Sequence, residues 1–334
     1  MRSAFLISLL LFSCAFAANL PFYDENISKV LYRCTKTNGG TCNAIDAPDI
    51  IRMITSYLSL DDKKQSRLVD RMWYTFTEYT PDDIVRILKN ASTKGQLEVV
   101  KRLLADRSVD PSAEDNWAVK RSSENGHLEI VELLLTDERV DPSAEDNWAV
   151  QLASENGHSE IVELLLADKR VDPSKGYNSA VKHASSNGHL EIVKLLLTDE
   201  RVDPSAEDNW AVQFASMNGH LEVVELLLND ERVDPSADDN WAVKRASTNG
   251  HSEIVELLLA DKRVDPSSND NRAVKYASAN GHSEVVELLL ADERVDPSAD
   301  DNWAVRRASA NGHLEVVELL LTDDRVDFPV LHYK

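Results

Sequence analysis

Histidine, serine and aspartate recur at fixed spacing through most of this 334-residue sequence, and these residue types bind metals or perform nucleophilic catalysis. Seven histidines each follow an Asn-Gly pair at intervals of 31 residues: His127, His158, His189, His220, His251, His282 and His313. In a helical stack, equivalent residues of neighbouring units are about 10 Å apart, whereas a zinc ligand lies about 2 Å from its metal. A single ion cannot bridge two units, so we expect a structural histidine ladder fixed by backbone hydrogen bonds, with a metal site or pH switch as the alternative.

Two other kinds of chemistry fit the repeated residues poorly. The acidic loop at residues 137–141 lacks the dense oxygen ligands and the turn glycine of a calcium loop, so we expect solvated carboxylates paired locally with Arg139. A Ser-His-Asp triad would have to be present seven times over, because all three residue types keep the same register in every copy. The sequence therefore predicts no catalytic, metal or cofactor site, and a protein that is not an enzyme.

Composition excludes several further classes. With 58 acidic and 36 basic side chains the net charge is -22, which repels phosphate backbones and makes a nucleic-acid partner unexpected. A hydrophobic content of 43% excludes a mostly disordered chain. No run approaches the roughly 20 apolar residues of a membrane-spanning helix, and three cysteines are too few for a disulfide framework.

The first residues are typical of a secretory signal. An apolar run over residues 4–16 ends in small residues at Ala15 and Ala17, which suits cleavage after Ala17 and a secreted protein. The alternatives are an uncleaved hydrophobic N-terminus or a misplaced start codon, and a cytoplasmic protein. Cleavage would leave the pair Cys34 and Cys42, which can bridge in an oxidising compartment.

A 31-residue repeat fills residues 84–331 as eight units, the first of them degenerate. Repeats of 20 to 50 residues are typical of stacked supersecondary units. The sequence thus divides into a signal segment at residues 1–17, a segment without repeats at residues 18–83, the repeat array at residues 84–331 and a tail at residues 332–334. We expect a monomer.

Local signals within one unit predict a helix, a turn, a second helix and an extended loop. Asp115 and Asn116 suit the N-cap of the first helix, and Gly126 suits its left-handed C-terminal turn. The second helix, at residues 128–135, is apolar except for two glutamates, so neighbouring units must bury nearly all of it. Pro142 then ends the unit. No single unit can bury such a helix, which is the physical reason for stacking eight.

The repeat resembles the ankyrin repeat. Residues 148–166 read WAVQLASENGHSEIVELLL, which is similar to the family's T-P-L-H-x-A-x-x-G-H-x-E-V-V-x-L-L-L core. Trp or another residue replaces the family's Thr, and Gln, Lys or Arg replaces its His, so the family's Thr-His hydrogen bond cannot form. The unit is also two residues shorter than the usual 33. The resemblance implies an all-α, ankyrin-type helical solenoid of about eight repeats, a protein-binding role and no intrinsic catalysis.

Variation among the copies predicts where a partner binds. Positions spaced i, i+4 and i+7 share one face of the first helix, which in ankyrin-like proteins resembles the inner, concave surface. The second and third positions vary freely between copies, and the face carries residue types that are enriched in binding hot spots. The predicted partner-binding residues are Trp148, Leu152, His183, Trp210, Phe214, Met217, Trp241, Arg245, Tyr276, Trp303 and Arg307. The alternative for the Trp column is core packing against the next unit.

The segment before the array resembles a degenerate F-box, a helical motif that docks the Skp-type adaptor of cullin-RING ubiquitin ligases. The resemblance rests on the apolar and basic positions of residues 47–74: Pro48, Ile50, Ile51, Ile54, Ser56-Tyr57-Leu58, Arg67-Leu68-Val69, Arg71 and Trp73-Tyr74. Alternatively, these residues form helices that cap the first repeat. At the other end, Phe328, Val330, Leu331 and Tyr333 can cover the last helix.

The sequence therefore favours a protein–protein interaction scaffold whose acidic surround favours a basic partner. The alternative is a substrate receptor of a cullin-RING ubiquitin ligase. Secretion and a cytosolic ligase are compatible only in an effector delivered into another cell. A purely structural spacer would not need a variable face.

Overall fold

The computed structural model describes residues 80–327. The chain divides into two compact units, Met1–Ile87 and Leu88–Lys334, and nearly all the described residues belong to the second. The described residues contain sixteen helices and no strand, which confirms the predicted all-α fold. The predictions for the signal segment, the cysteine pair, the F-box-like motif and the covering C-terminal side chains fall outside the described residues.

The helices follow one another as eight pairs, and we number the repeats 1 to 8 accordingly. The pairs are α5 (Pro81–Thr93) and α6 (Leu97–Leu104), α7 (Ala113–Glu124) and α8 (Leu128–Leu135), α9 (Ala144–Glu155) and α10 (Ser159–Leu166), α11 (Lys175–Ser186) and α12 (Leu190–Leu197), α13 (Ala206–Asn218) and α14 (Leu221–Leu228), α15 (Ala237–Asn249) and α16 (Ser252–Leu259), α17 (Ser268–Asn280) and α18 (Ser283–Leu290), and α19 (Ala299–Asn311) and α20 (Leu314–Leu320).

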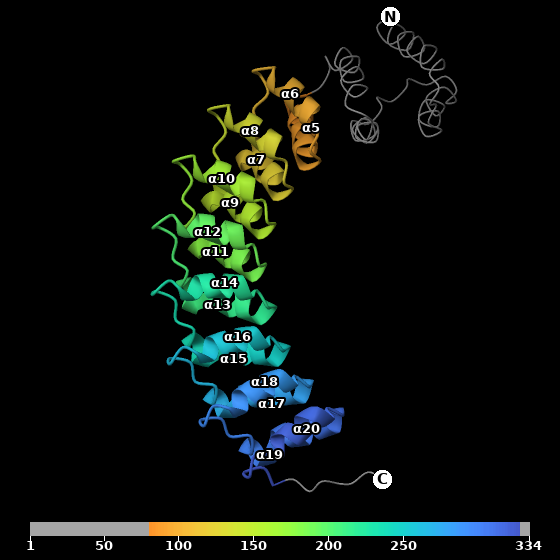
Figure 1. The fold of residues 1–334 in the computed structure, drawn as a ribbon. Helices are drawn as coiled ribbons and strands as arrows, with labels where there is room; N and C mark the ends of the chain where they lie inside the picture. The colour runs from red at the N-terminus through yellow and green to blue at the C-terminus, as the bar shows by residue number, and fades with distance from the viewer. Residues whose placement is uncertain (1–79, 328–334) are drawn as a thin grey trace, which may run out of the picture. The chain divides into compact units, whose positions relative to one another are not determined.

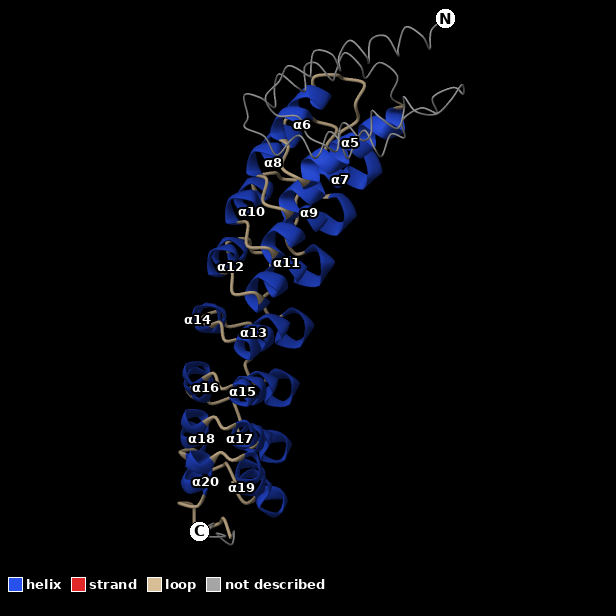
Figure 2. Ribbon diagram, turned by 90° about the vertical axis from the view of Figure 1, so that its right-hand side faces the viewer, coloured by secondary structure: helices blue, strands red, loops and turns tan. Residues whose placement is uncertain are grey.

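From α7 onward the first helices form one row and the second helices another, as Figures 1 and 2 show. From α6 onward each helix packs on its counterpart in the next repeat, and from α7 onward the two helices of a pair pack on each other. The core lies between the rows: Val119 of α7 and Val131 and Leu134 of α8 are fully buried, as are their counterparts in most repeats. Every repeat thus completes its hydrophobic core with side chains of its neighbours, as the repetition predicts.

The second helices are less buried than the sequence predicts. In α8, Ile130, Val131 and Leu134 are buried, whereas Leu128 and Leu133 remain half-buried. The expectation of burial on nearly every side is therefore wrong. A helix in a stack has neighbours along the row and across it, but none on its outer side, so only its inner stripe is enclosed.

The first helix begins with a left-handed turn that the sequence did not predict. Glu114, Asp115 and Asn116 have φ values of 53°, 53° and 62°, a region in which Asn and Asp are tolerated better than most residues. The Asn116 side chain does not cap its own helix; its Oδ1 accepts a hydrogen bond from the backbone N–H of Asp141, 2.7 Å away in the next repeat. The predicted N-cap is therefore wrong, because this long-range contact takes the side chain that would form it.

The same contact joins most successive repeats. It has lengths of 2.7 to 2.8 Å at Asn116–Asp141, Asn147–Asp172, Asn178–Asp203, Asn209–Asp234, Asn240–Asp265 and Asn271–Asp296. The asparagines of this set are buried or nearly so, and their left-handed backbone aims the side-chain amide at the next loop. Each asparagine thus supplies an acceptor that a loop N–H would otherwise lack.

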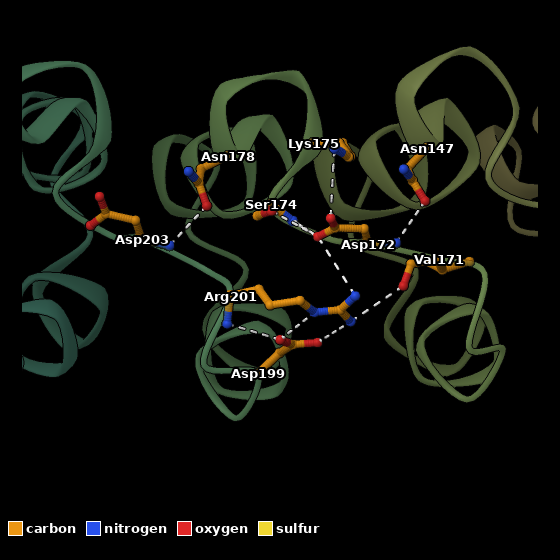
Figure 3. A network of polar contacts seen from close by, with 9 residues as sticks. All are labelled: Asn147, Val171, Asp172, Ser174, Lys175, Asn178, Asp199, Arg201 and Asp203. Atoms are coloured by element: carbon orange, nitrogen blue, oxygen red, sulfur yellow. Dashed lines mark hydrogen bonds and ion pairs between the residues drawn. The ribbon is translucent and has the colours of Figure 1, made fainter.

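An aspartate and an arginine form a second contact in the loops of repeats 2 to 8, shown for one repeat in Figure 3. Arg201 donates from Nε and Nη2 to the Asp199 carboxylate at 2.9 and 2.6 Å, and from Nη2 to the Val171 carbonyl of the preceding repeat at 3.3 Å. These side-chain hydrogen bonds lower the pKa of Asp199. In the equivalent pair of repeat 2, the side-chain hydrogen bond from Arg139 lowers the pKa of Asp137 to about 2. The expected local arginine pairing of the loop aspartates is confirmed.

The Asn-Gly-His motif forms a third contact between repeats. The His220 Nε2 atom lies 2.9 Å from the Ser186 carbonyl oxygen of the preceding repeat, to which the Asn218 amide also donates at 2.8 Å. A carbonyl only accepts, so Nε2 carries the proton. Gly188 lies under the imidazole ring: a Cβ added there would be 2.5 Å from His220 Nδ1. The seven histidines all make this contact, at 2.9 to 3.1 Å, and so form the predicted structural ladder.

Candidate partner-binding face

The exposed side of the first helices carries three columns of side chains, which we call the first-helix face. Column 1 consists of Trp117, Trp148, Ser179, Trp210, Trp241, Arg272 and Trp303. Column 2 consists of Arg121, Leu152, His183, Phe214, Arg245, Tyr276 and Arg307. Column 3 consists of Glu124, Glu155, Ser186, Met217, Thr248, Ala279 and Ala310. No member of the three columns is buried, so every predicted partner-binding residue is at least partly accessible.

The contacts between repeats explain why column 3 can vary. The carbonyl oxygen of Met217 accepts hydrogen bonds from His251 Nε2 at 3.0 Å and from Asn249 Nδ2 at 2.7 Å. These contacts use the backbone of the column 3 residue and leave its side chain unused. The array therefore holds together whichever residue stands in column 3, and that side chain is free to serve another purpose.

Aromatic rings join the columns of repeats 4 to 6 into one continuous ladder. Ring centroids are 6.0 Å apart between His183 and Trp210, 3.9 Å between Trp210 and Phe214, and 5.1 Å between Phe214 and Trp241. The Arg245 guanidinium lies 5.0 Å from the Trp241 ring centroid and extends the ladder. Such pairs each contribute about 0.5–1.5 kcal/mol beyond the area they bury, so these contacts favour the ladder arrangement before any partner arrives.

A second group occupies repeats 7 and 8. The rings of Tyr276 and Trp303 are 5.5 Å apart, and Arg272 and Arg307 lie 5.1 and 5.4 Å from these two rings, respectively. Among the described residues, no ring contact joins this group to the ladder of repeats 4 to 6. Most of the predicted residues thus form two groups by their ring contacts, and Trp148, Leu152 and Met217 belong to neither.

The alternative interpretation of the Trp column as core is supported only in part. Trp210 and Trp241 are half-buried because the Phe214 ring lies against both. Trp148 is 43% exposed, the most open tryptophan among the described residues, and its charged neighbour is Lys120, 5.3 Å from its ring. The tryptophans therefore pack sideways along the face and leave its outer side accessible.

A row of nearly buried lysines supports the face from beneath, and the sequence did not predict it. Lys120, Lys182, Lys244 and Lys275 are each at most 8% exposed, at the position where the family resemblance would place histidine. A buried charge needs a partner, and Lys120 and Lys182 form ion pairs with Glu145 and Glu207 of the following repeat. In the same row, Gln151 and Gln213 instead donate to backbone carbonyls, at 2.5 and 2.7 Å.

Unpaired carboxylates flank the first-helix face. Asp115, Asp146 and Asp208 in the left-handed turns are exposed and form no ion pair within the described part of the chain. Repeat 4 interrupts this acidic row with Lys175, Gly176 and Tyr177, and the Tyr177 side chain is 78% exposed. The face therefore combines aromatic and arginine side chains with an acidic border.

Comparison with known families bears directly on this arrangement. The family model for ankyrin repeats (three copies) matches residues 88–177, 150–239, 181–270 and 243–330, so the matches cover almost the whole array. The chain belongs to the ankyrin repeat family. Ankyrin repeats are protein–protein interaction scaffolds and are typically not enzymes. No curated protein matches the chain.

This ankyrin array differs from the family core at the positions of the family's Thr-His hydrogen bond, as its sequence predicts. Lysine or glutamine replaces the family's histidine, and the contacts to the next repeat's glutamate or to a backbone carbonyl take the place of the missing Thr-His hydrogen bond. Residues 80–327 contain no helix long and apolar enough to cross a membrane. The same residues contain no group of three or more His, Cys, Asp or Glu side chains that could hold a metal ion.

Proposed function

We propose that this ankyrin protein binds a partner protein on the first-helix face, with the aromatic ladder of repeats 4 to 6 as the main anchor. The observation that carries the proposal is the separation of two roles within one helix. Buried Ala, Val and Ser side chains and the backbone carbonyls of column 3 hold the stack together. The side chains of all three columns remain at least partly accessible, and those of columns 2 and 3 differ from repeat to repeat.

The residue types of the ladder suit a binding hot spot. Trp, Tyr and Arg are enriched among the residues that dominate the energetics of protein interfaces, and aromatic side chains bury large areas. Trp210 and Phe214 are already stacked at 3.9 Å, so a partner meets a surface that does not have to be ordered on binding. Such preorganisation favours affinity.

The charge of the face favours a basic partner. The exposed carboxylates of Asp115, Asp146 and Asp208 line the border of the face and form no ion pair with any residue of 80–327. The whole chain carries a net charge of -22. Attraction between complementary surfaces raises the association rate and is screened by salt. We therefore expect partner binding to slow as ionic strength rises.

Photo-crosslinking tests the position of the interface. A photoreactive amino acid is placed at Phe214 or Tyr276 on the first-helix face, and at Glu225 or Glu287 on the exposed side of the second helices in the same two repeats. The four variants are irradiated in an extract of the source, and the crosslinked protein is identified by mass spectrometry. We expect one defined partner from the first pair of positions; the same partner crosslinked only from the second pair contradicts the proposal.

A further inference from the structure

Repeat 2 contains an arginine held between an aromatic ring and a carboxylate. The Arg121 guanidinium carbon lies 4.1 Å from the centroid of the Trp117 ring, and its Nη1 atom forms an ion pair with Glu124. These three residues are the column 1, 2 and 3 members of α7. A planar guanidinium stacks on an indole and pairs with a carboxylate at the same time, so repeat 2 shows a complete guanidinium site, filled by its own chain.

Repeat 3 keeps the two walls of this site and lacks the arginine. Its three columns read Trp148, Leu152 and Glu155. Among the described repeats, only repeats 2 and 3 combine Trp in column 1 with Glu in column 3. A leucine side chain ends well before the position of a guanidinium, so the place between the ring and the carboxylate has no occupant from α9.

Exposure shows the effect of the missing arginine. The Glu155 side chain is 46% exposed, whereas Glu124, paired with Arg121, is 28% exposed. Trp148 is 43% exposed, whereas Trp117 is half-buried. Both walls of the site are thus more open in repeat 3.

Both sites have a lysine of the preceding repeat beside the indole ring. Lys89 lies 4.5 Å from the Trp117 ring, and its counterpart Lys120 lies 5.3 Å from the Trp148 ring. Each of these lysines is paired with a glutamate of the following repeat. A lysine at this position is therefore compatible with a guanidinium on the same indole, as repeat 2 demonstrates.

Among the described residues, the Glu155 carboxylate forms no ion pair with a lysine or an arginine. Its carboxylate lies 3.6 Å from His183 Nδ1, a contact that is an ion pair only when the imidazole is protonated. The neighbouring Asp146 is exposed and forms no ion pair among the described residues. Repeat 3 thus presents uncompensated negative charge beside an open indole face, which is the environment that a cationic side chain requires.

We propose that repeat 3 recognises an arginine side chain of the partner, whose guanidinium takes the place between Trp148 and Glu155 that Arg121 takes between Trp117 and Glu124. This inference rests on the proposed function and specifies one contact within it. The occupant is an arginine in a basic segment of the partner, because the template in repeat 2 is a guanidinium and the site is acidic. Leu152 would line the aliphatic part of that side chain.

The test uses the full chain labelled with 5-fluorotryptophan and the probe Nα-acetyl-arginine amide. The Trp148 fluorine signal is assigned with Trp148→Phe, and its shift is followed during titration by NMR. Nα-acetyl-citrulline amide, which has nearly the same shape without the charge, is the control probe. We expect a saturable shift at Trp148 with the arginine probe and an affinity lower by about two- to fivefold or more with the citrulline probe.

Two reciprocal variants use the difference between repeats 2 and 3. Leu152→Arg supplies the arginine within the chain, so the Trp148 shift should be lost. Arg121→Leu empties the site of repeat 2, so a new saturable shift should arise at Trp117. Both positions are accessible on the helix surface, and circular dichroism confirms that the variants remain folded.

Three results would each overturn the inference: equal affinities for the two probes, an unchanged Trp148 response in Leu152→Arg, or no response at Trp117 in Arg121→Leu. The proposed function is tested separately by affinity for the crosslinked partner. If Phe214→Ala weakens that partner and Trp148→Phe and Glu155→Gln do not, the arginine site is wrong and the interface remains. If none of these changes affects the partner, the interface itself is wrong, whatever the probe shows.

Discussion

Replacing Gly188 with alanine separates the backbone requirement of the Asn-Gly-His motif from its role between repeats. Gly188 has a φ of +75°, and an added Cβ would lie 2.5 Å from His220 Nδ1 and 2.7 Å from His220 Cε1. Alanine at positive φ costs about 1–2 kcal/mol. The His220 ring must also move, which breaks its 2.9 Å hydrogen bond to the Ser186 carbonyl at a cost of about 0.5–1.5 kcal/mol. We therefore expect Gly188→Ala to lower the free energy of unfolding by about 1.5–3.5 kcal/mol.

Gly312 provides a matched control, because its φ is +80° and no atom of the described residues lies within 4 Å of the position of an added Cβ. Gly312→Ala should show the backbone cost alone, about 1–2 kcal/mol. Urea denaturation followed by circular dichroism measures both variants. Since Gly312 lies in the last repeat, a second control keeps the position fixed: in a His220→Ala background, Gly188→Ala should cost about 1 kcal/mol less than in the wild type. Equal costs of Gly188→Ala in the two backgrounds would refute the contact between repeats.

Three further predictions concern the other contacts between repeats. The pKa of Asp137 in the folded state is about 2, below the value of about 3.9 in an unfolded chain. The stabilisation by the Asp137–Arg139 pair is therefore complete above about pH 4 and is lost as the pH falls toward 2. A helical signal in acid titration that disappears above pH 5 would argue against these aspartate–arginine pairs. Asn209→Ala removes the acceptor of the Asp234 N–H and should cost about 1–3 kcal/mol, which an unchanged urea midpoint would contradict. Lys182→Gln should be nearly neutral in the same assay, because glutamine occupies this row in two other repeats. Lys182→Glu should destabilise the fold, because it places a carboxylate beside that of Glu207. Similar urea midpoints for the two variants would disprove the Lys182–Glu207 ion pair.

Local sequence signals predicted most of the helical architecture. The paired helices follow from the apolar pattern of residues such as Val131 and Leu134, which are fully buried. The turn follows from Gly126, which has a φ of +76°. The histidine ladder follows from the 31-residue spacing, because equal spacing in a regular stack places each imidazole in the same surroundings. In each case the responsible residues lie close together in sequence or repeat with the period of the stack.

The features that the sequence did not predict depend on contacts between repeats. Asp115 and Asn116 have the composition of an N-cap, and only the Asp141 N–H, 25 residues away, directs the Asn116 side chain elsewhere. The sequence alone suggests that Lys120 lies on the surface. It is nearly buried instead, and Glu145, also 25 residues away, compensates its charge. Such pairings cannot be found from propensity or periodicity within one unit.

The candidate face was predictable by position more than by contact. Variation among the copies identified accessible columns, and no predicted residue is buried. The stacking of Trp210 on Phe214 required coordinates, since residues at i and i+4 lie on one face without having to touch. The proposed arginine site at Trp148 also required the structure. Arg121 lies between Trp117 and Glu124, and only this arrangement shows what Leu152 lacks at the equivalent position.

The most direct test of the central claim is the equilibrium affinity of the crosslinked partner for two double variants. Phe214→Ala with Tyr276→Ala removes one ring from each aromatic group, and Glu225→Ala with Glu287→Ala changes exposed side chains of the second helices in the same repeats. Melting measured beside each titration confirms that both variants are folded. We expect the first variant to bind at least about tenfold more weakly and the second to bind like the wild type. A partner that binds the first variant with wild-type affinity, or loses affinity only for the second, would show that the first-helix face is not the interface.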